Sequence, residues 1–329
     1  MGDARVVCFG EMLLRFAPAD GKAMRDAQMM SVHVAGAEAN VAISLAKLGL
    51  PAAMATVLPE NALGDRALDT LALHGVDTGA CIRRPGRMGT FYIESPLAGR
   101  EGGFFYDRSG SAFADGVDGI DWERALAGAE WLHLSGITAA LGDAAVRAMR
   151  RAVIVARQLG VFISFDCNFR PLLWQGRDDL AAALLLEFAS SAKLVFASDW
   201  DARLVLGTRA HQLVTTPAAA CHLFEVLPAT HWVAATTRER DGEGERLGAS
   251  LSTRDDVVNV PLSPITPYVD RVGGGDAFAA ALLFGLASRW DDERALRFAH
   301  RACVMKHAIP GDFSTLTAAE VEEGLALAG

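Results

Sequence analysis

Short apolar runs alternate with helical patterns along most of the 329-residue chain, and this alternation restricts the fold more than any other feature. Several runs, such as Leu194–Ala197, are apolar throughout, as is typical of strands buried on both faces. Segments with helical spacing lie between them, for example Glu38–Leu48 and Ala144–Leu159. The pattern predicts an α/β fold with a central, mostly parallel sheet flanked by helices. The expected strands are Arg5–Phe9, Ala53–Leu58, Trp131–Leu134, Val161–Asp166, Leu194–Ala197 and His231–Ala235, and further helices are expected over 275–288, 293–308 and 317–327.

Residues 12–35 and 88–113 break this alternation. They contain short β-type pieces, such as Thr90–Glu94 and Gly103–Arg108, and too little helix for a strand–helix–strand unit. We interpret both regions as parts of one small β lid inserted into the α/β core. Residues 1–329 are then expected to form a single domain with this lid.

The composition restricts the partners of the chain. With 31 basic and 40 acidic residues the formal net charge is −9, so a phosphate-rich polymer would be repelled and no nucleic-acid partner is expected. The longest apolar stretches fall short of the ~18 residues of a membrane helix, and the N-terminus does not resemble a signal peptide. We therefore expect a soluble cytoplasmic protein without a membrane partner.

The cysteines and histidines carry no sign of a metal or redox site. The five cysteines form no C-x-x-C, and the eight histidines form no H-x-x-H or H-E-x-x-H. We expect the cysteines to be small core residues and His133 to be a buried, hydrogen-bonded residue. Trp131 and Trp174 are interpreted as packing residues rather than as stacking platforms.

The most informative segment is DRVGGGDAFAAALLFGL, residues 270–286. Three glycines, Gly273, Gly274 and Gly275, precede Asp276 and an apolar helix. Successive glycine amides can point into one concavity, and the helix adds free N–H groups and the positive end of its dipole. Such a concavity suits a phosphoryl group that gains charge during transfer. The segment predicts an anion-binding turn.

Asp276 is the candidate catalytic base, because its carboxylate can face the same point as the glycine amides. It would accept the proton of a substrate hydroxyl that attacks the γ-phosphorus of ATP. We expect the helix dipole to keep Asp276 ionised and weakly basic. The alternative is a flexible loop followed by an ordinary N-cap aspartate, and these letters alone do not separate the two interpretations.

Other phosphate-binding motifs fit less well. A G-x-G-x-x-G that began at Gly273 would need glycine at position 278, where Phe278 stands. The chain has neither G-x-x-x-x-G-K-[ST] nor the H-R-D signature of protein kinases.

Two stretches together resemble the signatures of the ribokinase-like (PfkB) family of sugar kinases. GAEANVAISLAKLG, residues 36–49, is similar to its N-terminal signature, and residues 270–286 are similar to its C-terminal D-T-x-G-A-G-D. Arg271 and Gly274 replace the usual threonine and alanine, and Ala35 stands where a second glycine is common. The resemblance covers nearly the whole chain and implies an ATP- and Mg²⁺-dependent carbohydrate kinase.

Within the family the chain resembles the 2-keto-3-deoxygluconate kinases. This likeness rests on FFYDRSGSA (104–112), LHLSGI (132–137), DCNFRPLLW (166–174) and KHAIPGDF (306–313). It implies that Arg108 and Arg170 hold the carboxylate of a sugar acid, for which a guanidinium fork is suited. The other residues that it places around the sugar are Gly36, Asn40, Tyr106 and Asp312.

Each of these assignments has a structural alternative. Arg108 and Arg170 could form surface ion pairs, for which Asp107 and Asp166 are near in sequence. Asp312 could be an ordinary turn residue after Pro310-Gly311.

The nucleotide site departs from the family pattern. Many members carry N-x-x-E, whereas this chain has Ser198-Asp-Trp-Asp201, in which Asp201 could still hold a magnesium-bound water. The nucleotide loop, often K-x-G-x-x-G, reads Thr236-Thr-Arg-Glu-Arg-Asp241. We expect Ser198, Thr236, Thr237 and Arg238 to contribute to nucleotide binding.

The resemblance thus implies a kinase that phosphorylates a primary hydroxyl of 2-keto-3-deoxygluconate. A kinase for another sugar, such as fructose or 2-keto-3-deoxygalactonate, is the first alternative. A sugar-acid sensor without catalysis is the second. Because family members often dimerise through the lid, and a solvated β-edge invites pairing, a homodimer is also expected.

Overall fold

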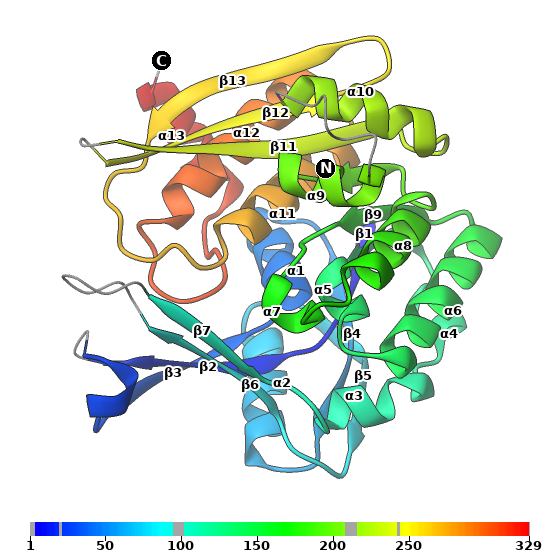
Figure 1. The fold of residues 1–329 in the computed structure, drawn as a ribbon, viewed down its shortest axis with the longest axis vertical. Helices are drawn as coiled ribbons and strands as arrows, with labels where there is room; N and C mark the ends of the chain where they lie inside the picture. Colours follow the sequence, from blue (N-terminus) through cyan, green and yellow to red (C-terminus); the bar gives the residue numbers. More distant parts are fainter. Residues whose placement is uncertain (1–3, 20–21, 95–101, 208–215, 242–243, 329) are drawn as a thin grey trace.

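A computed structural model describes residues 4–19, 22–94, 102–207, 216–241 and 244–328 of this chain. Its centre is a nine-stranded sheet (Figure 1). The strands are β1 (Arg5–Phe9), β4 (Ala52–Pro59), β5 (Asp77–Arg84), β8 (Ala129–Ser135), β9 (Phe162–Asp166), β10 (Leu194–Phe196), β11 (Trp232–Asp241), β12 (Gly244–Ser252) and β13 (Val257–Pro264). They run in the order β13-β12-β11-β10-β9-β8-β1-β4-β5, and all pairs are parallel except β11–β12 and β12–β13. The predicted mostly parallel sheet is confirmed.

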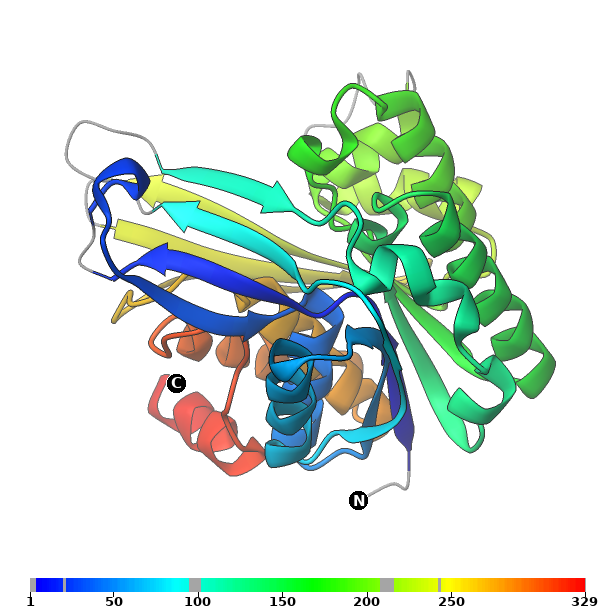
Figure 2. The same ribbon diagram turned by 90° about the horizontal axis from the view of Figure 1, so that it is seen from below.

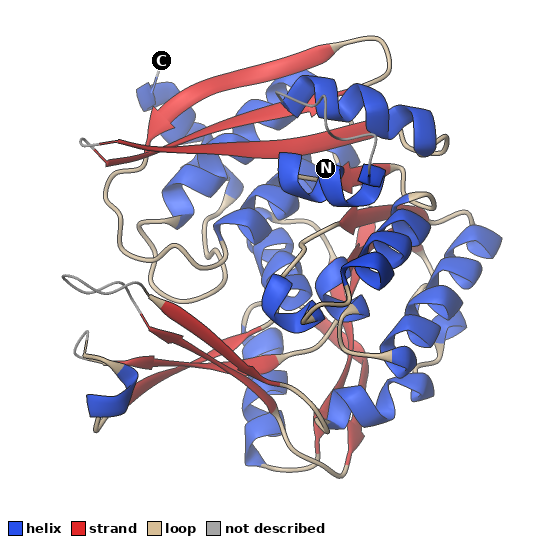
Figure 3. Ribbon diagram, in the orientation of Figure 1, coloured by secondary structure: helices blue, strands red, loops and turns tan. Residues whose placement is uncertain are grey.

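Helices cover both faces of this sheet, as Figure 3 shows with helices in blue and strands in red. Because successive strand residues point to opposite faces, Val7 and Phe9 enter one apolar core while Val6 and Cys8 enter the other. The first core includes α3 (Ala112–Gly116), α4 (Trp122–Ala125), α5 (Gly136–Ala139), α6 (Asp143–Leu159), α7 (Pro171–Trp174), α8 (Asp178–Ala189), α9 (Asp199–Leu206) and α10 (Thr216–Val226), and the second includes α1 (Ala37–Leu48), α2 (Ala62–Leu73), α11 (Gly274–Ala287), α12 (Asp292–Lys306) and α13 (Ala318–Ala328).

A second, four-stranded sheet lies where the lid was predicted and extends away from the helical layers (Figure 2); we refer to this sheet as the lid. Its strands are β2 (Leu13–Pro18), β3 (Met30–Ala35), β6 (Gly89–Glu94) and β7 (Gly103–Asp107), in the order β3-β2-β6-β7. Both predicted regions therefore meet in one sheet, although residues 20–21 and 95–101 lie outside the described residues. One boundary was wrong, because Ser111 already caps α3 and Phe113 belongs to the main core. The two 3₁₀ turns are η1 (Met24–Asp26) and η2 (Val117–Gly119).

Strands at the edges of the large sheet differ most from the prediction. The sequence did not indicate β5, β12 or β13, and the predicted nucleotide loop is the second half of β11. β5 and β13 have a neighbour on one side only, so they expose polar residues and lack the continuous apolar runs of the central strands.

Most of the residues expected in the core are buried, with one cysteine as the exception. Trp131 and Trp174 are fully buried. His133 is buried and lies 3.1 Å from Ser164 Oγ, and burial lowers its pKa to about 3. Of the cysteines, Cys8, Cys167 and Cys303 are buried and Cys81 is half-buried, whereas Cys221 is exposed and does not fit the prediction. In the described part of the chain no helix is both long and apolar enough to cross a membrane.

Candidate active site

A cavity of about 560 Å³ lies between the small sheet and the carboxyl ends of β8, β9 and β10. In open α/β sheets, ligands commonly bind outside the carboxyl ends of the strands. The sequence-predicted residues that line this cavity are Gly36, Asn40, Tyr106, Arg108, Arg170, Ser198, Asp201, Thr236, Arg238, Gly273, Gly274, Gly275, Asp276 and Asp312. The structure therefore brings together residues from the lid, α1, β11 and the start of α11.

The glycine turn begins α11, with Gly273 as its N-cap residue. Gly273 has φ +78°, and a Cβ there would lie 1.6 Å from the backbone oxygen of Asp312. At Gly274 a Cβ would come within 2.7 Å of the His307 ring, whereas at Gly275 it would meet nothing within 4 Å. The first two glycines are thus required by the packing of the protein itself. Gly275 leaves free space against the backbone at the helix N-terminus, where amides lack intrahelical acceptors.

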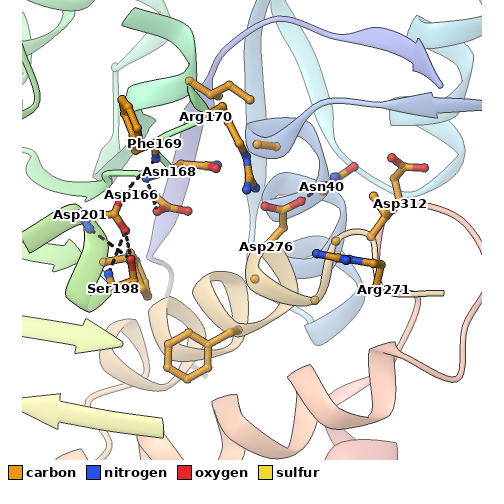
Figure 4. Close-up of a pocket in the computed structure, with 18 of the residues that line it drawn as sticks. Asn40, Asp166, Asn168, Phe169, Arg170, Ser198, Asp201, Arg271, Asp276 and Asp312 are labelled. Atoms are coloured by element: carbon orange, nitrogen blue, oxygen red, sulfur yellow. Dashed lines mark hydrogen bonds between the residues drawn. The ribbon is translucent and has the colours of Figure 1, made fainter. Parts of the chain in front are cut away.

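Asp276 lies in the first turn of α11 and faces α1. The Asn40 amide donates a hydrogen bond from Nδ2 to Asp276 Oδ2 at 2.7 Å (Figure 4). Burial raises the pKa of Asp276 to about 6, although Asn40, Arg170 and Lys306 lower it. With this pKa Asp276 is still mostly ionised at neutral pH, as expected, but it is not the weak base that the helix dipole alone would make it, because desolvation of the carboxylate dominates.

Arg170 precedes α7, and its guanidinium points toward Asp276 in Figure 4. Its side chain is exposed, and among the described residues it makes no ion pair within 4.0 Å. The alternative of an ion pair with Asp166 is therefore not what the structure shows. Arg170 has its donors available to a ligand in the cavity.

Arg108 is in a different environment. It is 5% exposed, and its Nε donates to Glu11 Oε2 at 2.6 Å. Ser111 Oγ donates to the other oxygen of Glu11. The alternative of a surface pair with Asp107 is wrong, since Asp107 pairs with Arg87. Arg108 lines the cavity, but the carboxylate that its Nε binds in this structure is that of Glu11.

Asp312 and Tyr106 lie at the lid side of the cavity. Asp312 is buried, and burial raises its pKa to about 7. Its Oδ2 lies 2.9 Å from Arg15 Nε, although the orientation is not that of a hydrogen bond. Arg15 also donates two hydrogen bonds to Asp270 at 3.3 and 2.9 Å. The Tyr106 ring stacks on Phe91 with centroids 6.0 Å apart.

Two carboxylates lie near each other, Asp166 as the last residue of β9 and Asp201 in the first turn of α9. Both carboxylate oxygens of Asp201 already accept hydrogen bonds from the protein. Oδ1 accepts from Phe169 N at 3.1 Å, and Oδ2 accepts from Ser198 N and Oγ. Burial raises the pKa of Asp166 to about 8, with further increases from Asp201 and Asp276. Sequence reasoning did not assign Asp166 to the site, although an acidic residue at the carboxyl end of a buried parallel strand was a usable signal.

The predicted nucleotide residues are only partly brought to the cavity. Alternation along β11 directs Thr236 and Arg238 toward it, whereas Thr237 is exposed and does not line it. Arg238 donates from Nη1 to Glu245 at 2.8 Å, and its Nη2 lies 2.9 Å from His307 Nε2. The side chain of Thr237 therefore does not reach the site in this structure.

Comparison with known proteins establishes the class. Residues 3–307 match the family described as pfkB family carbohydrate kinase. The chain belongs to this family, and it is an ATP-dependent sugar kinase.

Kinases with two different sugar-acid names are among the proteins similar to this chain. Over 327 residues the chain is 30% identical to the 2-dehydro-3-deoxygalactonokinase of Haloferax volcanii, with 98% of this chain and 96% of that protein covered. It is 27% identical over 329 residues to the 2-dehydro-3-deoxygluconokinase of Thermoproteus tenax, with 97% and 93% covered. The crystal structure of the 2-dehydro-3-deoxygluconokinase from Thermotoga maritima superposes with a TM-score of 0.89 at 33% identity and covers 98% of each chain.

Proposed function

We propose that this kinase transfers the γ-phosphate of ATP to a primary hydroxyl of 2-keto-3-deoxygluconate, which is the same compound as 2-dehydro-3-deoxygluconate. One observation carries the proposal: a single cavity contains the glycine turn, Asp276, and the Arg170 guanidinium without an ion-pair partner among the described residues. A neutral sugar would not require such a cation, whereas a sugar carboxylate is well held by a guanidinium fork. The Haloferax relative favours the galactonate epimer as the second candidate.

Asp276 would act as the general base. The substrate hydroxyl oxygen bonds to the γ-phosphorus, the bond to the bridging oxygen of ADP breaks, and the hydroxyl proton passes to Asp276. Asn40 fixes the carboxylate through its 2.7 Å hydrogen bond. A pKa of about 6 leaves Asp276 mostly ionised at neutral pH and more basic than an exposed aspartate.

The start of α11 would stabilise the charge that develops on the transferred group. The amides of the first helical turn have no intrahelical acceptors, and the helix dipole adds positive potential there. The open space beside Gly275 allows a phosphoryl oxygen to approach the backbone. These donors are fixed before the reaction, so little reorganisation is needed in the transition state.

Kinases of this family use ATP with Mg²⁺. Among the described residues no group of three or more His, Cys, Asp or Glu could hold a metal alone. This fits Mg²⁺, which keeps several waters and binds mainly through phosphates. Asp201 would hold a magnesium-bound water, and Asp166 would be a second partner, since a cation favours its charged form. When bound, Mg²⁺ neutralises charge on the phosphates of ATP.

The proposal is tested by measuring ADP release with ATP and Mg²⁺ over a panel of sugars. The panel contains 2-keto-3-deoxygluconate, its galactonate epimer, fructose, ribose and gluconate. We expect the highest kcat/KM with 2-keto-3-deoxygluconate. Preference for the galactonate epimer would support the second candidate, and turnover confined to fructose or ribose would overturn the sugar-acid assignment.

The role of Arg170 is tested separately. Arg170→Lys should raise the KM for the sugar acid more than it lowers kcat, because a single ammonium cannot reproduce the two parallel hydrogen bonds of the fork. Arg147→Lys is the matched control, since Arg147 is an exposed arginine that pairs with Asp118 on the surface. If both variants keep the wild-type KM, Arg170 does not bind the carboxylate.

The lid dimer and the cytoplasmic location remain predictions. Several apolar side chains on the lid are exposed, including Met29 and Phe105, both 64% exposed, which supports an interface there. A monomeric mass by light scattering at assay concentration would rule out the dimer.

A further inference from the structure

Lys306, the last residue of α12, carries a buried ammonium group that the reaction scheme above does not use. Its side chain is 0% exposed. Nζ donates hydrogen bonds to three backbone oxygens, Val272 O at 2.9 Å, Ile309 O at 3.0 Å and Gly311 O at 2.9 Å. These three bonds use every donor of the ammonium group.

The three acceptors belong to two turns that meet beside the candidate anion site. Val272 directly precedes Gly273, and Gly311 directly precedes Asp312. The two turns are in direct contact, because a Cβ on Gly273 would lie 1.6 Å from Asp312 O. The position of the first amides of α11 therefore depends on how the second turn is held.

Three carboxylates and one guanidinium act on the Lys306 ammonium group. Asp270 accepts hydrogen bonds from Val272 N at 3.0 Å and from Gly311 N at 3.1 Å, so it joins the same two turns. Burial lowers the pKa of Lys306, and Arg15 lowers it further, whereas Asp270, Asp312 and Asp276 raise it. The ammonium thus lies between carboxylates and carbonyl dipoles that favour a cation.

We propose that Lys306 is a positioning residue for phosphoryl transfer, whose ammonium acts as a built-in monovalent cation that holds the glycine turn against the 309–312 turn. Backbone carbonyls arranged around a cation are the environment that replaces the hydration shell of K⁺ in proteins. A lysine supplies the same charge without exchange with solvent. The inference rests on the kinase activity proposed above, and it predicts that turnover does not depend on which monovalent cation is present.

The test begins with the wild-type protein. Its kcat should be unchanged when K⁺ is replaced by Na⁺ or by choline at constant ionic strength. A requirement for K⁺ or NH₄⁺ would overturn the proposal without any variant.

Two substitutions then separate charge from packing. Lys306→Met fills the space without a charge, and Lys306→Ala leaves room beside the three carbonyls. Both should lower kcat by about 100-fold, since small displacements of reacting groups cost about that much. K⁺ or NH₄⁺ should raise the kcat of Lys306→Ala at least tenfold, whereas neither ion should change the kcat of Lys306→Met. Lys47→Met, a partly exposed lysine on α1, is the matched control.

A second readout does not require turnover. In melting experiments, K⁺ or NH₄⁺ should stabilise Lys306→Ala relative to choline, whereas the wild type should show no such difference. If no sugar of the panel is phosphorylated, this difference in melting temperature still shows whether the three carbonyl oxygens around Lys306 bind a cation. Wild-type kcat in Lys306→Met, or the absence of any ion effect on folded Lys306→Ala, would refute the proposal.

Discussion

Replacing Asp276 by Asn should stabilise the folded protein while it removes the proposed catalytic base. Burial raises the pKa of this carboxyl from 3.8 to about 6. The folded protein therefore disfavours the ionised form relative to the unfolded chain. Because a tenfold change in proton affinity corresponds to about 1.36 kcal/mol, the cost of ionised Asp276 is about 3 kcal/mol.

The sign of the pH dependence follows from the raised pKa. Protonated Asp276 contributes stability that is fully present below about pH 4 and is lost as the pH rises through about 6. Asparagine does not titrate, and its amide oxygen can still accept the hydrogen bond from Asn40. The gain in Asp276→Asn should thus be about 0.5 kcal/mol at pH 4 and about 1 kcal/mol at pH 4.5, and it should approach about 3 kcal/mol above pH 7.

Urea unfolding of wild type and variant at pH 4.5 and pH 8 measures this difference, and ADP release measures the loss of activity. We expect kcat to fall by several orders of magnitude. Asp69→Asn, at an exposed position on α2, is the control for removing an acidic charge. A stability change that is equal at both pH values, or a variant that is less stable at pH 8, would contradict the reasoning about burial.

Three further predictions concern the same region. The kcat/KM should fall about tenfold per pH unit below about pH 6, as Asp276 becomes protonated, and a pH–rate profile that is flat down to pH 5 would exclude it as the base. Gly275→Ala should keep the wild-type melting temperature but lose turnover, because a Cβ there would fill only the open space beside the helix N-terminus. Gly273→Ala should lower the melting temperature, because its Cβ would clash with Asp312 O and its φ is positive. Melting curves and kinetics of the two variants measure this difference. Glu11→Gln should destabilise the protein by about 3–5 kcal/mol in denaturant titrations, because it leaves the Arg108 guanidinium buried without a charged partner.

The sequence was sufficient to predict the parts of the fold that repeat a simple physical pattern. β1 was predicted with its observed ends, and the other expected strands were located, because strands buried on both faces must be continuously apolar. Edge strands such as β5 and β13 follow no such rule. The hairpin of β11 and β12 was missed because the polar run after Ala235 resembles a loop in composition.

Within the site, motifs of adjacent residues could be interpreted from the sequence, whereas contacts between residues that are distant in sequence could not. The glycine turn and Asp276 are adjacent in sequence, so their geometry could be anticipated. The pKa of Asp276 could not, since it depends on burial against α1. Nor could the pairing of Glu11 with Arg108, which are separated by 97 positions. The three acceptors of Lys306 likewise become visible only when two turns are brought together.

The small sheet is fastened to the main body through β2 and β3, and this limits how it can move. Arg66 on α2 donates a hydrogen bond to Val32 O on β3 at 2.9 Å. Arg15, on β2, is 4% exposed and carries two hydrogen bonds to Asp270 in the segment that leads into the glycine turn. Moving β2 away would separate Arg15 from both Asp270 and Asp312, and it would leave the buried Arg15 guanidinium without a charged partner, which costs several kcal/mol. Rotation of all four strands about a common hinge would break these contacts, so we expect a sugar to enter the cavity without such a rotation.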